Sequence, residues 1–429
     1  MNPDIATERT STELSFDEIA HIARTAPKEL ISASVAERDD VSRAPGLILT
    51  KEDIINLKTY EATALALPST LEDVKNYLEF GNANDGGPGL AHKDFLNTFT
   101  KTREHALRWA PLNDEIRLTS TKLKLFSNYM IIYGESITDL NTGIKNSEEI
   151  KKYLKSNNIT TLAQLKNIKI TSDEHFPGIA LEKDTKKDLH SYLSLMFDQI
   201  NTNLEETEAL KKNITSFSDD LTNIVLPKIK TQLQLVSDNT VQTDITKLKN
   251  SIDERSLRIE EKNKEYAALV EKSFTSAASL NIAGLGMAIY MGVEAETTRN
   301  ERNQLKEEQQ KEIEKLSKKN QTLASLYRIK EKLVDLKSVT LDAETATKNL
   351  RQLWNSILEF VKASKKSADN INDTVSLGLF IHHFKLVVEP WREIQKKTDL
   401  FIKIFKEADQ EYKQTHVNKM QQTHHTMEL

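Results

Sequence analysis

The sequence predicts an all-α protein: an elongated molecule with a long antiparallel coiled-coil stalk, an apolar tip, and a helical-bundle tail built from both N- and C-terminal parts. Three observations predict this fold class. The chain has only 12 glycines and 9 prolines among 429 residues, about 5% against an average near 12%, so it lacks the turn residues that β-hairpins and barrels require. Apolar residues repeat with a 3.5-residue period over long stretches. One uncharged segment interrupts an otherwise highly charged chain.

Composition and charge exclude several classes of protein. A hydrophobic fraction of 38% is too high for a disordered chain. A net charge of −5 with interspersed signs argues against nucleic acid as a partner. The absence of cysteine excludes a disulfide framework and a thiolate metal site. The start, MNPDIATERTSTELS, has neither the basic region nor the apolar core of a Sec signal peptide, so we expect a secreted protein to be exported by another route.

The N-terminal residues carry little pattern. Ser15 is able to cap a short helix that stops at Pro27, but we expect a flexible N-terminal segment over 1–44. Two helix starts follow, at Thr50-Lys-Glu-Asp53 and Ser69-Thr-Leu-Glu72, because each has a small capping residue with a carboxylate three positions later.

Further helices are expected on both sides of a strong loop. The loop is GNANDGGPG, 81–89, and helices should follow over 90–109 and 112–140, separated at Pro111. With the C-terminal helices they form the expected tail, which combines 45–225 with 342–415, while the expected stalk combines 182–272 with 294–341.

A heptad seam then runs for more than five heptads and should be buried against another helix. Pro227 should kink or end this helix. One lattice of the seam holds Leu189, Met196, Asn203, Leu210, Phe217 and Ile224, and the other holds Leu193, Ile200, Thr207, Ile214 and Leu221.

Two arms of similar length follow, over 227–272 and 299–341, and they predict an antiparallel hairpin that buries its seams against itself. The first arm carries Ile245, Ile252, Ile259 and Tyr266 seven residues apart, with Arg255 and Lys262 on the companion lattice. The second arm carries Leu305, Ile313, Leu316, Leu323, Tyr327, Val334 and Leu341.

Between the arms lies SFTSAASLNIAGLGMAIYMGV, 273–293, without a single charge. It is interpreted either as a buried core helix or as an exposed apolar tip, and an exposed apolar patch marks a partner or membrane site. Gly284 and Gly286 favour a turn, which leaves legs of about ten residues, or roughly 15 Å, about one leaflet. The candidate membrane-binding residues are Leu280, Ile282, Leu285, Met287, Ile289, Tyr290, Met291 and Val293.

The sequence contains no constellation typical of an enzyme. It has no HExxH helix, G-x-S-x-G elbow, Walker loop or GxGxxG fingerprint, so we expect no catalytic residue, no cofactor and no metal ligand. His382 and His383 are interpreted as ordinary positions, because adjacent residues point to different helix faces. Two C-terminal helices are expected over 344–369 and 374–413, the second with an apolar run at 376–391.

The order of helices over 45–415, together with AASLNIAGLGMAIYMGVEAETTRNERNQL, resembles the A component of the alpha-xenorhabdolysin family of binary cytotoxins, within the cytolysin A-like α-helical pore-forming toxins. The resemblance implies a soluble monomer whose apolar end meets the target cell's lipid membrane. It also implies a partner, the B component of the binary toxin, with which the A component forms a ring-shaped, hemolytic pore. In such pairs the B component supplies the main membrane-crossing helices, and the A component binds, supports and activates it.

Two alternatives compete with this hypothesis. A single-span membrane protein should show an excess of Lys and Arg on one flank of its span, but 253–272 carry five basic and six acidic residues and 294–313 carry four and six. A coiled-coil scaffold explains the seams but not the uncharged segment.

Overall fold

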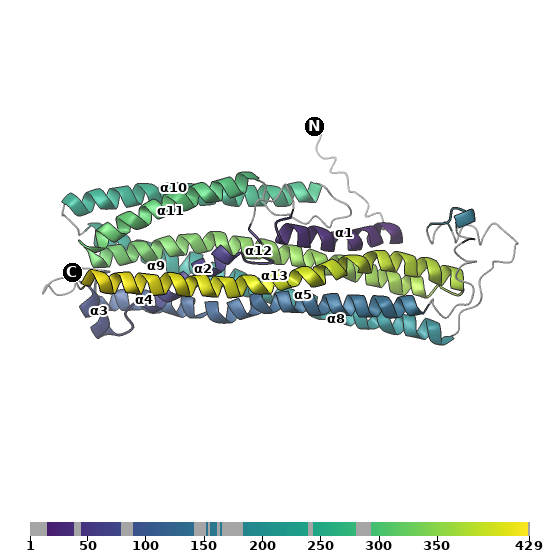
Figure 1. Ribbon diagram of the computed structural model, residues 1–429. Coiled ribbons are helices and arrows are strands. Elements are labelled where there is room, and N and C mark those ends of the chain that lie inside the picture. The colour runs from purple at the N-terminus through teal and green to yellow at the C-terminus, as the bar shows by residue number, and fades with distance from the viewer. Residues whose placement is uncertain are drawn as a thin grey trace, which may run out of the picture.

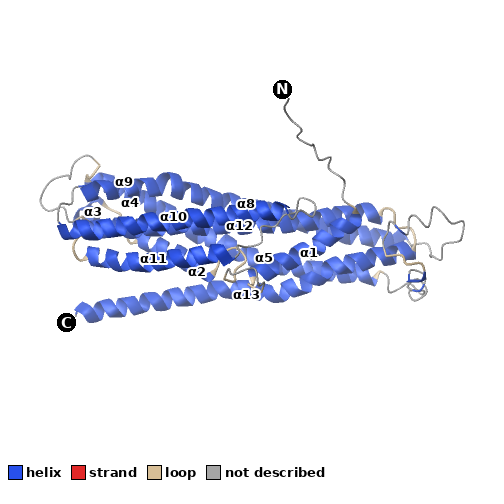
Figure 2. Ribbon diagram, turned by 90° about the horizontal axis from the view of Figure 1, so that it is seen from above, coloured by secondary structure: helices blue, strands red, loops and turns tan. Residues whose placement is uncertain are grey.

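Two long helices, α12 and α13, run the length of the molecule and organise the others around them (Figure 1). Every regular element of the described residues is a helix, and the helices share one long axis (Figure 2). The computed structural model describes residues 15–37, 44–78, 89–140, 183–238, 243–279 and 293–427, with 152, 155–160 and 164. The helices are α1 (Phe16–Ser34), α2 (Lys51–Leu65), α3 (Leu71–Tyr77), α4 (His92–Leu107), α5 (Trp109–Asp139), α8 (Lys183–Asp220), the π-helix η1 (Leu221–Val225), α9 (Leu226–Asp238), α10 (Thr243–Ser279), α11 (Val293–Ser317), α12 (Gln321–Ala368) and α13 (Thr374–Met427).

The predicted all-α, elongated fold is confirmed, and its core lies along the seam between α8 and α12. Trp354 on α12 is buried, donates a hydrogen bond to Thr207 Oγ1 at 2.9 Å, and packs edge-on against Phe126 of α5. On α8 the buried positions are the predicted ones: Leu189, Leu193, Met196, Ile200, Asn203, Thr207, Leu210, Ile214 and Phe217.

The seam departs from its predicted register at one place. The turn Leu221–Val225 is a π-helix, which adds a residue to the turn. Val225 is therefore buried, whereas Ile224, which continues the heptad lattice, is 42% exposed. The same π-turn precedes Pro227, and the helix continues through this proline as α9 rather than ending there.

The N-terminal expectation is wrong for residues 16–34. They form α1, which packs on α12 and α13. Ser15 does cap the helix, in a capping box with Glu18, but Pro27 lies inside the helix and does not stop it. The apolar face of α1 fixes the segment, because Ala23, Leu30 and Ile31 are buried.

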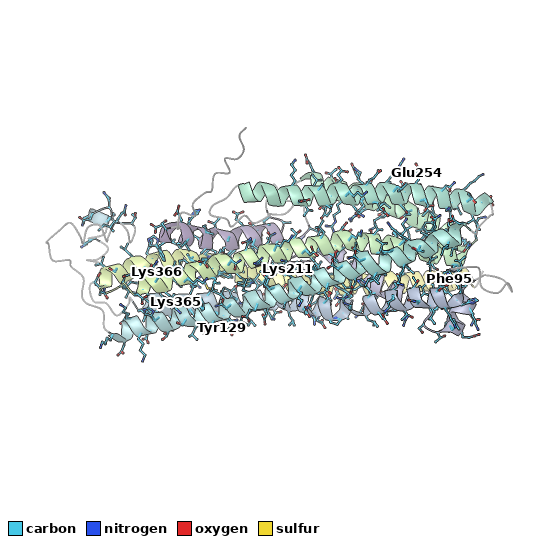
Figure 3. All side chains as sticks on the ribbon, turned by 180° about the vertical axis from the view of Figure 1, so that it is seen from behind. Phe95, Tyr129, Lys211, Glu254, Lys365 and Lys366 are labelled. Atoms are coloured by element: carbon cyan, nitrogen blue, oxygen red, sulfur yellow. The ribbon has the colours of Figure 1, made fainter. Side chains whose placement is uncertain are left out.

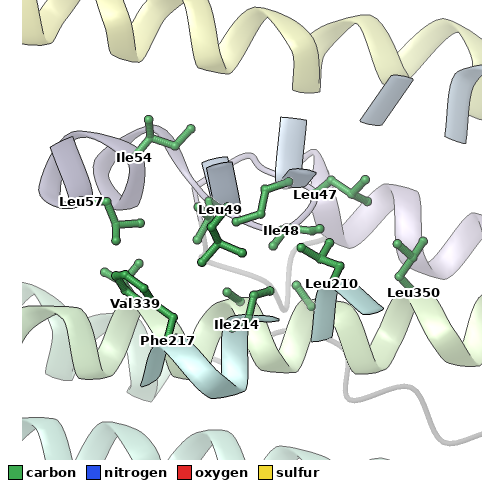
Figure 4. Close-up of a cluster of buried hydrophobic side chains, with 14 of the residues drawn as sticks. Leu47, Ile48, Leu49, Ile54, Leu57, Leu210, Ile214, Phe217, Val339 and Leu350 are labelled. Carbon is green, nitrogen blue, oxygen red and sulfur yellow. The ribbon is translucent and has the colours of Figure 1, made fainter. Parts of the chain in front are cut away.

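The chain between α1 and α2 is also part of the core. Leu47, Ile48 and Leu49 point toward α8 and α12 (Figure 4) and are nearly inaccessible to solvent. Thr50 then caps α2 in a capping box with Asp53, as its sequence predicts. The cap of α3 lies one residue later than predicted, at Thr70, which accepts from the amide of Asp73.

The structure differs from the predicted stalk at two chain reversals. The first lies between Asp238 and Thr243, so the arm 227–272 is divided between α9 and α10. The second lies at 318–320, where Asn320 caps α12, so 321–341 belong to the body and not to a second stalk arm. The hairpin consists of α10 and α11 alone, and it lies along the bundle (Figure 1).

The C-terminal apolar run is core in this structure. Leu377, Phe380, Phe384, Val387 and Trp391 are all buried. Pro390 lies inside α13, which continues past it.

Candidate functional site

The candidate site is the α10–α11 hairpin and the uncharged segment that joins its arms. Residues 273–279 of that segment extend α10, and Val293 is the first residue of α11. The predicted turn, Gly284 and Gly286, lies outside the described residues. So do the candidate membrane residues Leu280, Ile282, Leu285, Met287, Ile289, Tyr290 and Met291.

The two arms pair with each other along a seam of the predicted kind. Ile252, Ile259 and Tyr266 are buried in it. The charged members of the companion lattice find carboxylates on the opposite arm: Arg255 contacts Glu308 at 3.2 Å, and Lys262 contacts Glu301 at 2.6 Å. Hydrogen bonds from Lys262 to Glu301 and Glu265 raise the pKa of the Lys262 ammonium to about 12. The hairpin is therefore a paired unit in its own right.

The outer face of this unit carries charge, and it forms one edge of the molecule. Figure 3 shows Glu254 on the outside of α10, at the opposite edge from Tyr129 of α5. Leu257, an apolar residue on α10, is 63% exposed.

The inner face rests on the body through polar contacts. Asp253 accepts from the Tyr327 hydroxyl at 2.7 Å, and Ser338 donates to Asn263 at 2.9 Å. Lys306 contacts Asp335 at 2.8 Å. These contacts place α10 parallel and α11 antiparallel to α12. The hairpin thus runs back from the 318–320 reversal toward the middle of the body (Figure 1).

The arm ends nearest the uncharged segment meet the body at Arg299. This α11 residue is 3% exposed, and its Nη2 lies 2.9 Å from Asp53 Oδ1 and 3.3 Å from Glu52 Oε2. Its Nη1 lies 3.7 Å from Asp342 Oδ2 on α12. Burial opposes the charge of the guanidinium, but Asp53, Asp342 and Glu52 together raise the pKa of Arg299 well above its ordinary value. Arg299 is therefore a buried cation.

Sequence reasoning missed this cluster. A signal was available, because 294–312, at the start of the second predicted stalk segment, has few apolar residues, yet a helix that packs must bury one face. Its buried face is largely polar: Ala295, Thr298, Arg299, Arg302 and Gln309. The charged partners could not be identified, since Asp53 and Asp342 are far away in the sequence.

The described residues contain no group of three or more His, Cys, Asp or Glu side chains that could hold a metal ion. His383 instead contacts the Thr160 carbonyl at 3.0 Å through Nε2 and meets the Phe16 ring edge-on. None of the described helices is both long and apolar enough to cross a bilayer.

Comparison with known proteins finds likenesses among solved structures, whereas no protein-family model and no curated protein matches the chain. XaxA from Xenorhabdus nematophila is 26% identical, with 86% of this chain and 99% of that chain covered and a TM-score of 0.44. The XaxAB pore complex from the same organism is 26% identical, with 86% and 100% covered and a TM-score of 0.42. The HblL1 toxin component of Bacillus cereus is 18% identical, with 83% and 94% covered and a TM-score of 0.53.

The chain is thus similar to XaxA and to the XaxAB pore complex at 26% identity over 86% of its length. The likeness to HblL1 shows the fold, an elongated all-α bundle.

Proposed function

We propose that the chain is component A of a two-component α-helical pore-forming toxin. In this proposal a monomer binds the target membrane through the apolar segment 273–293 and assembles with the B component into a ring-shaped, cytolytic pore. The protein acts after secretion by a route other than Sec, and it acts by binding rather than by catalysis.

One observation supports the proposal above the others. The only long uncharged segment of the sequence joins the ends of two helices whose charged side chains pair with each other. Because the side chains of α10 and α11 pack and form ion pairs with each other, the hairpin does not need the uncharged segment as its hydrophobic core. The segment is then available to another apolar phase, and a lipid bilayer is the phase that takes eight large apolar residues without a charge.

The length of the segment favours an auxiliary role in the pore. Legs of about ten residues reach roughly 15 Å, about one leaflet. This protein would therefore anchor and position the B component, which would supply the helices that cross the membrane. The name of the XaxAB pore complex describes a pore that contains two components, and we propose an assembly of the same kind for this chain.

Release of a trapped dye from liposomes tests the proposal directly. The protein is added alone, and then together with a candidate partner encoded beside it. We expect binding to vesicles by this protein alone and dye release with the pair. Release by this protein alone at the same concentration would contradict the proposed division of labour, and failure to bind vesicles with or without the partner would contradict the proposed function.

The variant Ile282→Asp/Ile289→Asp tests the segment. A charge at membrane depth costs about 2.5–3.5 kcal/mol on insertion scales, so the double variant should lose most of its vesicle binding while its thermal unfolding stays unchanged. The matched control is Ile224→Asp/Leu257→Asp, which places the same two charges on apolar residues that are 42% and 63% exposed outside the segment. Equal binding by the two variants would mean that another surface meets the membrane.

The two alternatives are separated by solubility. A single-span membrane protein needs detergent for purification, and a scaffold protein does not bind pure lipid vesicles. Purification without detergent combined with vesicle binding excludes both.

A further inference from the structure

The α10–α11 hairpin is held against the body at both of its ends, but by different chemistry. Near the 318–320 reversal the buried side chains are mainly apolar, since Ile313, Leu316 and Leu323 are completely buried, and the hydrogen bond from Tyr327 to Asp253 adds a polar contact. At the end nearest the uncharged segment the contacts are ionic and centre on Arg299. Apolar contacts allow the hairpin to change its angle to the body without losing them, since the hydrophobic effect is non-directional. Ion pairs and hydrogen bonds require particular distances and angles, so the ionic contacts fix one position of the hairpin on the body.

The ionic end joins four elements. Arg299 of α11 contacts Asp342 of α12 and also Asp53 in the first turn of α2. Tyr266 of α10 donates to Asp342, with its hydroxyl 2.8 and 2.9 Å from the two carboxylate oxygens. Burial raises the pKa of the Tyr266 phenol, so it stays a neutral donor. Both arms of the hairpin therefore hold the same carboxylate of the body.

The Asp53 carboxylate is held in place by Thr50 independently of its contact with Arg299. Its Oδ2 accepts from the Thr50 amide at 3.0 Å and from the Thr50 hydroxyl at 2.7 Å, and this is the capping box of α2. Its Oδ1 accepts from Arg299 Nη2 at 2.9 Å. Asp53 Oδ2 thus takes part in the N-terminal cap of α2, and Oδ1 binds Arg299 of the hairpin.

We propose that Arg299, Tyr266, Asp53 and Asp342 form a clasp that keeps the hairpin folded along the body, and that the clasp opens when the protein engages a membrane. The hairpin would then turn about the apolar contacts at the 318–320 reversal and carry its far end away from α2. The role of the clasp in membrane binding rests on the proposed function, whereas the clasp itself does not.

The chemistry of the clasp suits a contact that must break. A buried ion pair adds little net stability, because the desolvation of both charges offsets their attraction. The same charges regain water when the hairpin leaves. An apolar contact of the same size would instead expose its surface at roughly 25 cal/mol per Å². A clasp of ions is therefore specific in geometry and is released at low cost.

A distance measurement tests the clasp without any membrane. Since the chain has no cysteine, spin labels can be placed at Asn300→Cys on α11 and Lys366→Cys on α12, two exposed residues. Arg299→Gln should shift the pulsed-EPR distance distribution toward longer values. The matched control is Arg302→Gln, because Arg302 lies on the same helix, is 4% exposed and contacts the amides of Asn263 and Asn303. Identical distributions for the two folded variants would overturn the clasp.

A reversible cross-link between the hairpin and the body tests whether the clasp must open for membrane binding, and it leaves the four clasp residues unchanged. Ser338 and Asn263 contact each other across the hairpin–body seam at 2.9 Å, so Asn263→Cys/Ser338→Cys, joined as a disulfide or by a thiol-cleavable bismaleimide, should hold the hairpin down. We expect about tenfold less flotation with anionic liposomes for the linked protein, and recovery after reduction, because only the open state is competent. Equal flotation of linked and reduced protein overturns the role in membrane binding. A reduced protein that fails to float contradicts the proposed function, and the clasp is then judged by the distances alone.

Discussion

Helix α12 meets α8 and the α10–α11 hairpin through faces of opposite chemistry. Toward α8 it presents Trp354, whose indole donates to Thr207 at 2.9 Å, and the nearby Leu350, Leu353 and Ile357 are completely buried. Toward the α10–α11 hairpin it presents Asp335, Ser338 and Asp342. The apolar face loses roughly 25 cal/mol for each Å² that is exposed to water, whereas paired polar groups exchange one set of hydrogen bonds for another. One helix thus carries both a permanent interface and an interface built to separate.

The largest effect should come from truncation in the apolar seam. Trp354→Ala removes a buried ring that packs against Phe126 and Trp391, and we expect about 3–5 kcal/mol of lost stability in denaturant-induced unfolding. The exposed Leu257→Ala is the control and should stay within about 0.5 kcal/mol of wild type. A loss below about 1 kcal/mol for Trp354→Ala would mean that this seam is not the permanent interface.

A second prediction separates local opening from global unfolding. Arg299→Met leaves Asp342 and Asp53 without their cation, and removal of one partner of a buried pair typically costs about 3–5 kcal/mol. Because the hairpin can leave the body, this cost should be limited to the free energy of opening. We expect faster hydrogen exchange at the amides of α11, with unchanged exchange in α8.

The matched variant is Arg299→Met/Asp342→Leu, which replaces both charges with apolar groups. Such replacements are often neutral or stabilising, so exchange in α11 should return toward the wild-type rate. Equal exchange in the single and double variants would show that the ions do not act as a pair.

The apolar seam was largely predictable, and the polar seam was not. Heptad spacing identified the buried face of α8 from Leu189 to Phe217, and the prediction failed at Ile224 because a π-turn shifts the register there. Patterns of this kind report which residues are buried, and they do not report the partner.

The two reversals show the same limit. Leu316 and Leu323 are seven residues apart and both are buried, so the lattice continues across 318–320 although the chain turns back there. The first reversal, between Asp238 and Thr243, divides the other predicted arm in the same way. Helix α1 was missed for a related reason: its partners, α12 and α13, lie roughly 300 residues or more away in the sequence.

A third prediction sharpens the contrast inside the apolar seam. Asn203 is a polar member of the heptad lattice, is 4% exposed, and its Nδ2 has no hydrogen-bond partner among the described residues. A polar residue at such a position lowers the stability of a coiled coil. Asn203→Leu should therefore raise the free energy of unfolding by about 1–2 kcal/mol, and Asn300→Leu, at an exposed position, should leave it unchanged. A destabilised Asn203→Leu variant would show that the amide is part of the packing.

The smallest expected effect concerns the protonation of His105. The body buries this titratable side chain in its neutral form, whereas the hairpin buries the charged Arg299. His105 stacks on Phe217, and its Nδ1 lies 2.7 Å from the Tyr60 hydroxyl while its Nε2 lies 3.0 Å from the Phe217 carbonyl. A neutral ring with its proton on Nε2 satisfies both contacts, since it donates to the carbonyl and accepts from the phenol. Burial is the main cause that lowers the pKa of His105 below its ordinary value of 6.5.

The sign of the pH effect follows from that shift. Above pH 6.5 the imidazole is neutral in the folded and the unfolded chain, so its contribution is fully present. As the pH falls below 6.5, His105 is protonated in the unfolded chain but stays neutral in the folded protein until the pH reaches its lowered folded-state pKa. Between these two pKa values the free energy of unfolding falls by up to about 1.4 kcal/mol per pH unit. His105→Gln should flatten this part of the curve relative to wild type. Parallel curves for His105→Gln and wild type between pH 7 and 5 would show that the body tolerates a charge at this site, and the contrast with Arg299 would then rest on packing alone.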